Sequence, residues 1–247
     1  MKPPAPDRPG DPWSGLRTHT PARIGLARSG SALATKALLE FRADHARARD
    51  AVGDGLDESA LAATLAPLGQ VLTVASAAPD RASYLRRPDL GRRLAAASQT
   101  TLAEHRGDYD LAVVIADGLS ARATLAAPAL IAALLPRLRG WRVAPFVIAR
   151  QARVALGDAV ATTLGAGAVA VLIGERPGLS VPVSLGVYAT WRPRAGSTDA
   201  DRNCLSNIHA AGTSPEEAAR RLAGLLAAMR QRGLSGVALK DEGVLLT

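Results

Sequence analysis

The chain is poor in the residues that mark several common protein classes. Of its 247 residues only Cys204 is a cysteine, which excludes an internal disulfide framework and a structural zinc site built on cysteines. Only eight residues are aromatic, too few for the platforms on which single-stranded nucleic acids stack. One cysteine and no disulfide predict a reducing, cytoplasmic location.

Long hydrophobic runs are also missing. The uncharged, strongly apolar stretches Ala123–Pro136 and Ala159–Gly174 are shorter than the ~20 residues that a transmembrane helix needs. Residues 1–12 hold five prolines and no apolar segment of the kind found in secretory signals. We therefore expect no membrane partner and no export.

Positive charge is abundant, but little of it comes from lysine. The formal net charge is +8 and the pI is near 10.6, a balance found in proteins that bind nucleic acids or phosphate-bearing ligands. Only three of the thirty basic residues are lysines, and alanine is very common, a pairing typical of a coding bias. We expect no nucleic-acid partner, and a basic nucleic-acid binder is kept only as a third class of function.

The predicted elements divide the chain into three parts. Residues 1–12 are predicted to be a disordered proline-rich tail, residues 13–106 a helical region, and residues 107–247 an α/β domain. In the helical region we expect helices over Ser29–Val52, from the N-cap Asp57 to about Leu68, over Arg81–Leu85 and over Leu90–His105, with a short strand at Val71–Ala75. The longest of these helices has a largely apolar stripe of Leu33, Ala37, Phe41 and His45.

From residue 107 onward, strands and helices alternate. We expect buried strands at Leu111–Ala116, Val143–Ala149 and Ala168–Ile173, an edge strand at Ser184–Trp191, and helices from Ala121 to about Leu138, over Leu156–Leu164 and over Ser214–Arg232. This alternation predicts a Rossmann-like sheet, in which ligands bind beyond the carboxyl ends of the strands.

Two strand ends carry polar residues, Asp117–Ser120 and Gly174–Leu179, and the second includes Glu175. Their glycines permit tight turns and a close backbone approach to a ligand. Neither segment is a dinucleotide fingerprint or a P-loop, and both are also compatible with ordinary turns. A stand-alone Rossmann-like module that binds a nucleotide or phosphate ligand is the alternative function.

Polar and reactive side chains also gather in Asp199–Gly212. A nucleophilic Cys204 activated by His209 is conceivable there, because a thiolate needs a nearby base. No oxyanion signature accompanies the pair. A small packed thiol and a structural imidazole are the alternatives.

Four motifs in this order resemble one family: Arg87–Leu94 (RPDLGRRL), Asp117–Ser120 (DGLS), Gly174–Leu179 (GERPGL) and Asp201–His209 (DRNCLSNIH). Together they are similar to the small (light) subunit of ethanolamine ammonia-lyase, over about Arg17 to Gly236. Any one motif is modest, but four in order are highly specific.

This resemblance implies a lyase that depends on adenosylcobalamin. In the family, helical N-terminal elements precede a Rossmann-like cobalamin-binding domain, which pairs with a large (β/α)8-barrel subunit in a hetero-oligomer that converts ethanolamine to acetaldehyde and ammonia. Substrate contacts lie in the large subunit, so no catalytic residue is expected here. The family's cobalamin-contacting positions match Val154, Glu175 and Cys204. Glu175 would accept hydrogen bonds from amides or hydroxyls, Val154 would add a backbone group and an apolar contact, and Cys204 would pack against the ligand.

The sequence departs from related patterns at two places. Asn207–Gly212 differs by one residue from the Asp-x-His-x-x-Gly pattern with which some B12 enzymes ligate cobalt, and Asn replaces the aspartate that would orient His209. We therefore expect no metal ligand in this chain. Many family members carry a longer N-terminal extension that directs them into a bacterial microcompartment. Here only the short proline-rich tail precedes Trp13, which argues against encapsulation.

Overall fold

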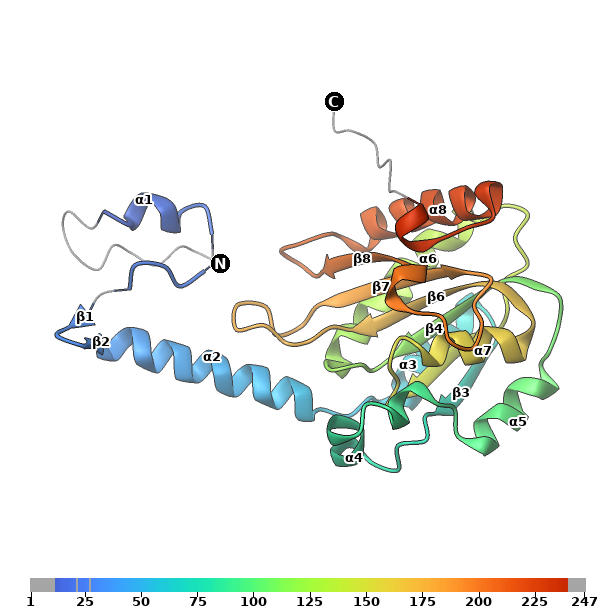
Figure 1. The fold of residues 1–247 in the computed structure, drawn as a ribbon, viewed down its shortest axis with the longest axis horizontal. Helices are drawn as coiled ribbons and strands as arrows, with labels where there is room; N and C mark the ends of the chain where they lie inside the picture. Colours follow the sequence, from blue (N-terminus) through green and yellow to red (C-terminus); the bar gives the residue numbers. More distant parts are fainter. Residues whose placement is uncertain (1–11, 21, 27, 240–247) are drawn as a thin grey trace.

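A six-stranded sheet with helices on both faces forms the centre of the molecule, and one long helix extends away from it (Figure 1). The computed structural model describes residues 12–20, 22–26 and 28–239, so nearly all of the predicted tail lies outside it. The strands are β1 (Arg28–Ser29), β2 (Ala32–Leu33), β3 (Val71–Ala75), β4 (Tyr109–Ala116), β5 (Phe146–Arg150), β6 (Ala166–Gly174), β7 (Leu185–Trp191) and β8 (Arg202–Ile208). The α-helices are α1 (Ser14–Arg17), α2 (Thr35–Gly53), α3 (Glu58–Leu65), α4 (Arg81–Arg86), α5 (Ala96–Glu104), α6 (Ala127–Leu134), α7 (Leu156–Leu164) and α8 (Pro215–Arg232).

The sheet has the order β3-β5-β4-β6-β7-β8, and its first four strands are parallel. β7 and β8 complete it as antiparallel strands. The mixed α/β class is therefore confirmed. β3 precedes residue 107, so the sheet draws its first edge strand from the segment predicted as the helical region.

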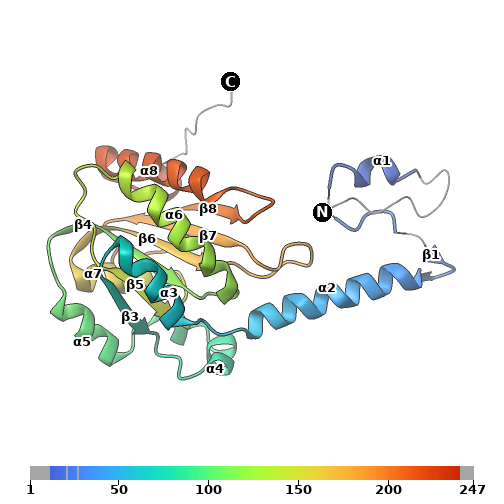
Figure 2. The ribbon, with the colours of Figure 1, turned by 180° about the vertical axis from the view of Figure 1, so that it is seen from behind.

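The side chains of each central strand contribute to two hydrophobic cores, one on each face of the sheet. In β4, Leu111, Val113 and Ile115 join one core, while the alternate residues Ala112 and Val114 join the other. α3, α6 and α8 cover the first face, as seen from behind, and α5 and α7 cover the second (Figure 2). A parallel strand buried on both faces needs an uninterrupted apolar sequence, and the prediction of this strand is confirmed.

The prediction that β7 is an edge strand is wrong. β8 pairs with it from Leu185↔Ile208 to Thr190↔Arg202 and is itself the edge. The segment Asp199–Gly212, in which we predicted no strand, thus contains one. Its buried residues lie on both faces of the sheet: Leu205 and Ile208 join the core under α8, whereas Arg202 pairs with Asp158 of α7.

Three predicted helices are shorter than expected. The helix over Ser29–Val52 begins only at Thr35, because β1 and β2 pair as a hairpin within Arg28–Leu33. The helix over Leu90–His105 begins only at Ala96, because Arg93–Ala95 runs beside β3: the Ala77 amide donates to the Arg93 carbonyl and the Ala95 amide to the Ala75 carbonyl. The helix from Ala121 is a 3-10 turn up to Ala126, continues as α6, and ends in another 3-10 turn, Leu135–Arg137. α7 and α8 occupy the predicted ranges to within a residue.

The described residues from 12 to 53 form what we call the arm, and residues 58–239 form the body. α2 extends from the body and carries α1, β1 and β2 at its far end (Figures 1 and 2). Only Ala48 and Ala51 of α2 are buried, and both lie near its body end. No helix in the described part of the chain is long and apolar enough to cross a membrane.

Candidate functional site

A cavity of about 1270 Å³ lies where the parallel strands β4, β5 and β6 end. Four segments and one strand contribute most of its lining: Gly118–Leu119, Arg153–Ala155, Ile173–Arg176, Arg194–Asp199 and Tyr188 of β7. The exposed side of α7 and the turn around Arg92 complete the wall. This is the edge of an α/β sheet at which ligands bind, as the sequence predicts.

Two glycines let the turns after β4 and β6 touch at the cavity floor. Gly118 has a φ of +54°, and a Cβ there would lie 2.1 Å from the Gly174 carbonyl oxygen. A Cβ on Gly174 would lie 2.1 Å from the Ser120 carbonyl oxygen and 2.5 Å from that of Asp117. No other residue fits at either position without moving the backbone, so the two predicted strand-end motifs form one structural unit.

Asp117 organises the loop between β5 and α7. Its side chain is 2% exposed, and its carboxylate accepts hydrogen bonds from the backbone amides of Gln151 (2.9 Å) and Ala152 (3.0 Å). Gln151 has a φ of +54°, a conformation that costs roughly 1 kcal/mol or more in a residue with a side chain. Burial raises the pKa of Asp117 despite these hydrogen bonds and the nearby Arg81. The buried carboxylate thereby fixes the strained loop that carries Val154.

A stack of cations and one aromatic ring lies behind this loop. The guanidinium carbons of Arg81 and Arg153 lie 5.0 and 4.4 Å from the ring centroid of Tyr84. Tyr84 is fully buried, and its hydroxyl donates to the Ala152 carbonyl at 3.0 Å. Arg81 also forms an ion pair with Asp117 (3.2 Å) and donates to the Val52 carbonyl at the end of α2. The cavity wall is thus tied to the arm through Arg81.

The structure brings two of the three predicted contact residues into the cavity. Val154 and Glu175 both line it, on the loops after β5 and β6. The Glu175 carboxylate accepts a hydrogen bond from the Ser184 hydroxyl at 2.5 Å and a long one from the backbone N–H of Asn207 at 3.4 Å. Gly186 leaves room for this side chain, since a Cβ there would lie 2.8 Å from Glu175 Oε1.

Cys204, the third predicted residue, is exposed on β8 and does not line the cavity. It lies opposite Tyr188 in the β7–β8 pairing, and Tyr188 does line the cavity. Although the residue as a whole is exposed, partial burial of its thiol and then the neighbouring Glu175 raise the pKa of Cys204, while its hydrogen bond with Tyr188 lowers it. The pKa of Tyr188 rises to about 12, first because of burial and then because of Cys204 and Glu175. A raised thiol pKa is the opposite of what a cysteine nucleophile needs.

The ring nitrogens of His209, which the nucleophile and metal hypotheses would use, already have hydrogen-bond partners. His209 Nε2 lies 2.6 Å from Asn207 Oδ1, and its Nδ1 accepts a hydrogen bond from the Ala211 amide at 3.2 Å. Both ring nitrogens are thus used within the turn after β8, and the hydrogen-bond partner of Cys204 is Tyr188. No cluster of three or more His, Cys, Asp or Glu side chains suited to a metal occurs among the described residues.

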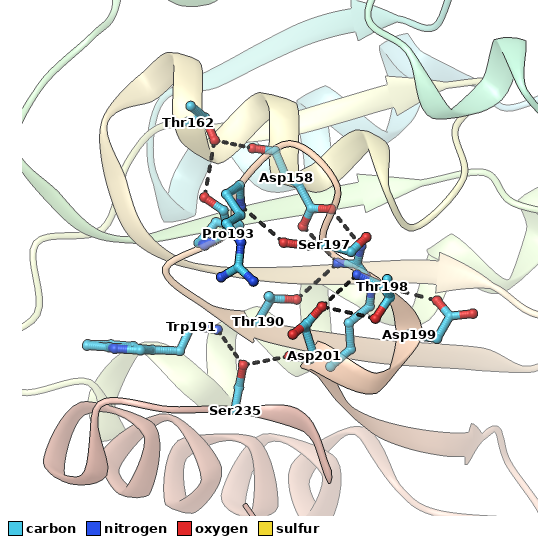
Figure 3. A network of polar contacts seen from close by, with 12 residues as sticks. Asp158, Thr162, Thr190, Trp191, Pro193, Ser197, Thr198, Asp199, Asp201 and Ser235 are labelled. Atoms are coloured by element: carbon cyan, nitrogen blue, oxygen red, sulfur yellow. Dashed lines mark hydrogen bonds and ion pairs between the residues drawn. The ribbon is translucent and has the colours of Figure 1, made fainter. Parts of the chain in front are cut away.

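Sequence reasoning missed a buried ion pair in the cavity wall. Arg202 of β8 donates to both carboxylate oxygens of Asp158 on α7, at 2.7 and 2.6 Å, and both residues are at most 7% exposed. Arg202 also donates to the Thr190 hydroxyl and the Ser197 carbonyl, so Asp158, Thr190 and Ser197 converge on one guanidinium (Figure 3). The pair ties the edge strand and the Arg194–Asp199 loop to α7. The Asp201–His209 motif was the available signal, since it places Arg202 directly after an acid, Asp201.

The chain is similar to a set of known proteins over nearly its whole length. Residues 10–240 match the family model "Ethanolamine ammonia-lyase light chain". Proteins named ethanolamine ammonia-lyase small subunit from Rhodopseudomonas palustris and Bradyrhizobium diazoefficiens are 54% and 53% identical, covering 93% and 95% of this chain and 90% and 92% of their own. The protein of that name from Pseudomonas syringae pv. tomato is 49% identical over 97% of this chain and 86% of its own. This chain therefore belongs to the ethanolamine ammonia-lyase light chain family, as a component of a lyase that has a larger partner subunit.

Proposed function

We propose that this chain is the small subunit of an adenosylcobalamin-dependent ethanolamine ammonia-lyase and that its cavity holds part of the cofactor. The other wall of the site is then supplied by a (β/α)8-barrel large subunit, and the pair converts ethanolamine to acetaldehyde and ammonia. The single observation that carries the proposal is the cavity at the strand ends, which gathers Val154, Glu175 and Tyr188, the neighbour of Cys204. A Rossmann-like interpretation of residues 107–247, with β3 added from residues 13–106, is part of the same proposal.

The residues of the cavity fit a corrinoid. The rim of the corrin carries primary amides, and the nucleotide tail carries ribose hydroxyls and a phosphate. Glu175 is a charged acceptor that suits amide and hydroxyl donors. Arg153 also lines the cavity, and its Nε atom is buried with no hydrogen-bond partner among the described residues.

In this proposal the chain's own residues bind and orient. Val154, held in place by the Asp117 contacts to its loop, gives an apolar contact, and Cys204 packs with Tyr188 at the sheet edge. When bound, adenosylcobalamin supplies radical chemistry through its cobalt–carbon bond. We assign no catalytic residue to this chain, because the substrate contacts are proposed to lie in the large subunit.

Co-expression with a large subunit tests the function directly. Acetaldehyde should form from ethanolamine only when both chains and adenosylcobalamin are present. The purified pair should also keep the corrinoid colour after desalting. A pair that stays colourless, or a chain that instead binds a nucleotide without turnover, would contradict the proposal.

Glu175→Ala tests the cofactor contact separately. We expect weaker corrinoid affinity in the complex with unchanged assembly, because only a ligand acceptor is removed. Glu104→Ala, at the exposed end of α5 and outside the cavity, is the control. Equal affinities in the two variants would remove Glu175 from the site.

A further inference from the structure

We infer that Arg153 and Arg92 form a phosphate-binding subsite in the cavity wall and that it takes the phosphodiester of the corrinoid's nucleotide tail. The inference rests on the proposed function, since it needs a corrinoid in the cavity. It concerns two arginines for which neither the family motifs nor the comparisons give a role.

Arg153 is prepared for an anion that the chain itself does not supply. The central carbon of its guanidinium lies 4.4 Å from the ring centroid of Tyr84. Gly91 makes this possible, because a Cβ there would lie 2.8 Å from the Tyr84 ring and 3.0 Å from Arg153 Cγ. Arg153 lines the cavity, its Nε is buried, and no acceptor for Nε exists among the described residues. A buried donor without an acceptor is costly and rare, so it points to a missing partner.

The charges around Arg153 leave this wall positive. The amide of Arg153 donates to the Gly91 carbonyl at 2.8 Å, which brings the adjacent Arg92 to the same part of the lining. Neither Arg92 nor Arg153 forms an ion pair with an acid in the described part of the chain.

Three acids of this region are already paired with other arginines. Asp117 pairs with Arg81 at 3.2 Å, and Asp158 pairs with Arg202 at 2.6 Å. Arg93, which follows Arg92, lies 3.6 Å from Asp89. The acids therefore leave the charges of Arg92 and Arg153 for a ligand.

Among the chemical groups of a corrinoid, the phosphodiester is the one that matches the donors and the charge of these arginines. The planar fork of an arginine presents Nε and Nη donors in the geometry of two phosphate oxygens. The contact with the ring supplies no oxygen acceptor, so the N–H donors of Arg153 remain without one. The corrin amides are neutral, so the phosphodiester is the anionic group that matches this wall.

Three corrinoids that differ in the tail separate the phosphate from the rest of the ligand. We would measure the Kd of cyano-cobinamide, cyano-cobinamide phosphate and cyanocobalamin by equilibrium dialysis against the full two-subunit complex. In the wild type, the two phosphate-bearing ligands should bind more tightly than cobinamide. Arg153→Gln should remove this advantage, weakening both by roughly 10- to 100-fold, while cobinamide is unaffected.

Two further variants keep the test independent of folding. Arg153→Lys retains the charge without the fork and should recover part of the advantage. Arg176→Gln removes an exposed arginine of the same cavity, on the Glu175 side, and should leave the advantage intact. Loss of affinity for all three ligands alike in Arg153→Gln, or no loss, would overturn the inference alone. Failure of the wild type to bind any of the three would overturn the proposed function as well.

Discussion

The body and the arm of this chain differ in how many of their apolar side chains are buried. In the body, strands such as β4 and β6 are buried on both faces, and two hydrophobic cores fill the space under the helices. In the arm, α2 spans 19 residues, of which only Ala48 and Ala51 are buried. A helix that leaves its apolar residues in water gains little from packing, so its stability rests mainly on local interactions.

The two phenylalanines of the chain show the contrast most directly. Phe146 on β5 is 3% exposed and belongs to a core, whereas Phe41 on α2 is 39% exposed. Phe41 stacks on His45, and the guanidinium of Arg23 lies over its ring, 5.8 Å from the centroid. The same side chain therefore has different consequences in the two regions, and the following predictions test the difference.

The largest effect is expected for Phe146→Ala. Removing a buried ring leaves a cavity in the core and should lower the free energy of unfolding by about 3–5 kcal/mol. Urea denaturation of the isolated chain measures it. A loss below about 1 kcal/mol would mean that this part of the core can collapse around the gap.

A slightly smaller effect is expected for Arg202→Gln. This change leaves Asp158 as a buried, uncompensated charge and should cost about 3 kcal/mol. Arg23→Gln is the matched change in the arm, where Arg23 pairs with a partly exposed Asp44, and it should cost less than about 1 kcal/mol. Equal losses in urea denaturation would remove the distinction between body and arm.

Cys204 on the edge strand β8 tests whether partial burial raises a thiol pKa even at an exposed position of the body. Cys204 has a raised pKa, so less thiolate exists at a given pH, and its alkylation should accelerate only above the pH at which an ordinary thiol reacts. Iodoacetamide rates measured against pH give the midpoint. Glu175→Gln removes a negative neighbour and should move it downward, whereas Tyr188→Phe removes a stabilising hydrogen bond and should move it upward. Shifts in the same direction would contradict the assigned causes.

The smallest effect is expected for Phe41→Ala. In the isolated chain it should change the free energy of unfolding by less than about 0.5 kcal/mol, because little surface is removed from a packed environment. The same urea denaturation as for Phe146→Ala provides the comparison. A loss of several kcal/mol would show that the arm packs more tightly than its exposure indicates.

Much of the fold could be predicted because its signals are local. Leu111–Ala116 reads as a buried parallel strand from its unbroken apolar sequence, and Ser214 with Pro215 marks the start of α8, where the Ser214 hydroxyl accepts from the Glu217 amide. β8 was missed because the interactions that hold its polar residues are distant in sequence. Arg202 is satisfied by Asp158 on α7, and Asn203 bonds to Gly236 near the chain's end.

The candidate site divides in the same way. The strand-end motifs containing Asp117 and Glu175 were found because a turn after a buried strand is visible in sequence. The stack of Tyr84 with Arg153 was not, since 69 positions separate the two residues and nothing local links them. The break in the helix predicted over Leu90–His105 has a similar cause, because it depends on hydrogen bonds to β3.

By itself, the sequence determined the alternation of strands and helices, the polar turns at the strand ends and, through four motifs, the family. These are properties of short segments, where hydrophobic period, capping residues and turn residues act on their own neighbours. Only the tertiary structure decided which side chains meet: Arg202 pairs with Asp158, Arg153 lies against Tyr84, and Glu175 and Val154 line the same cavity. Such meetings depend on strand order and on which charges are buried, and no local pattern carries that information.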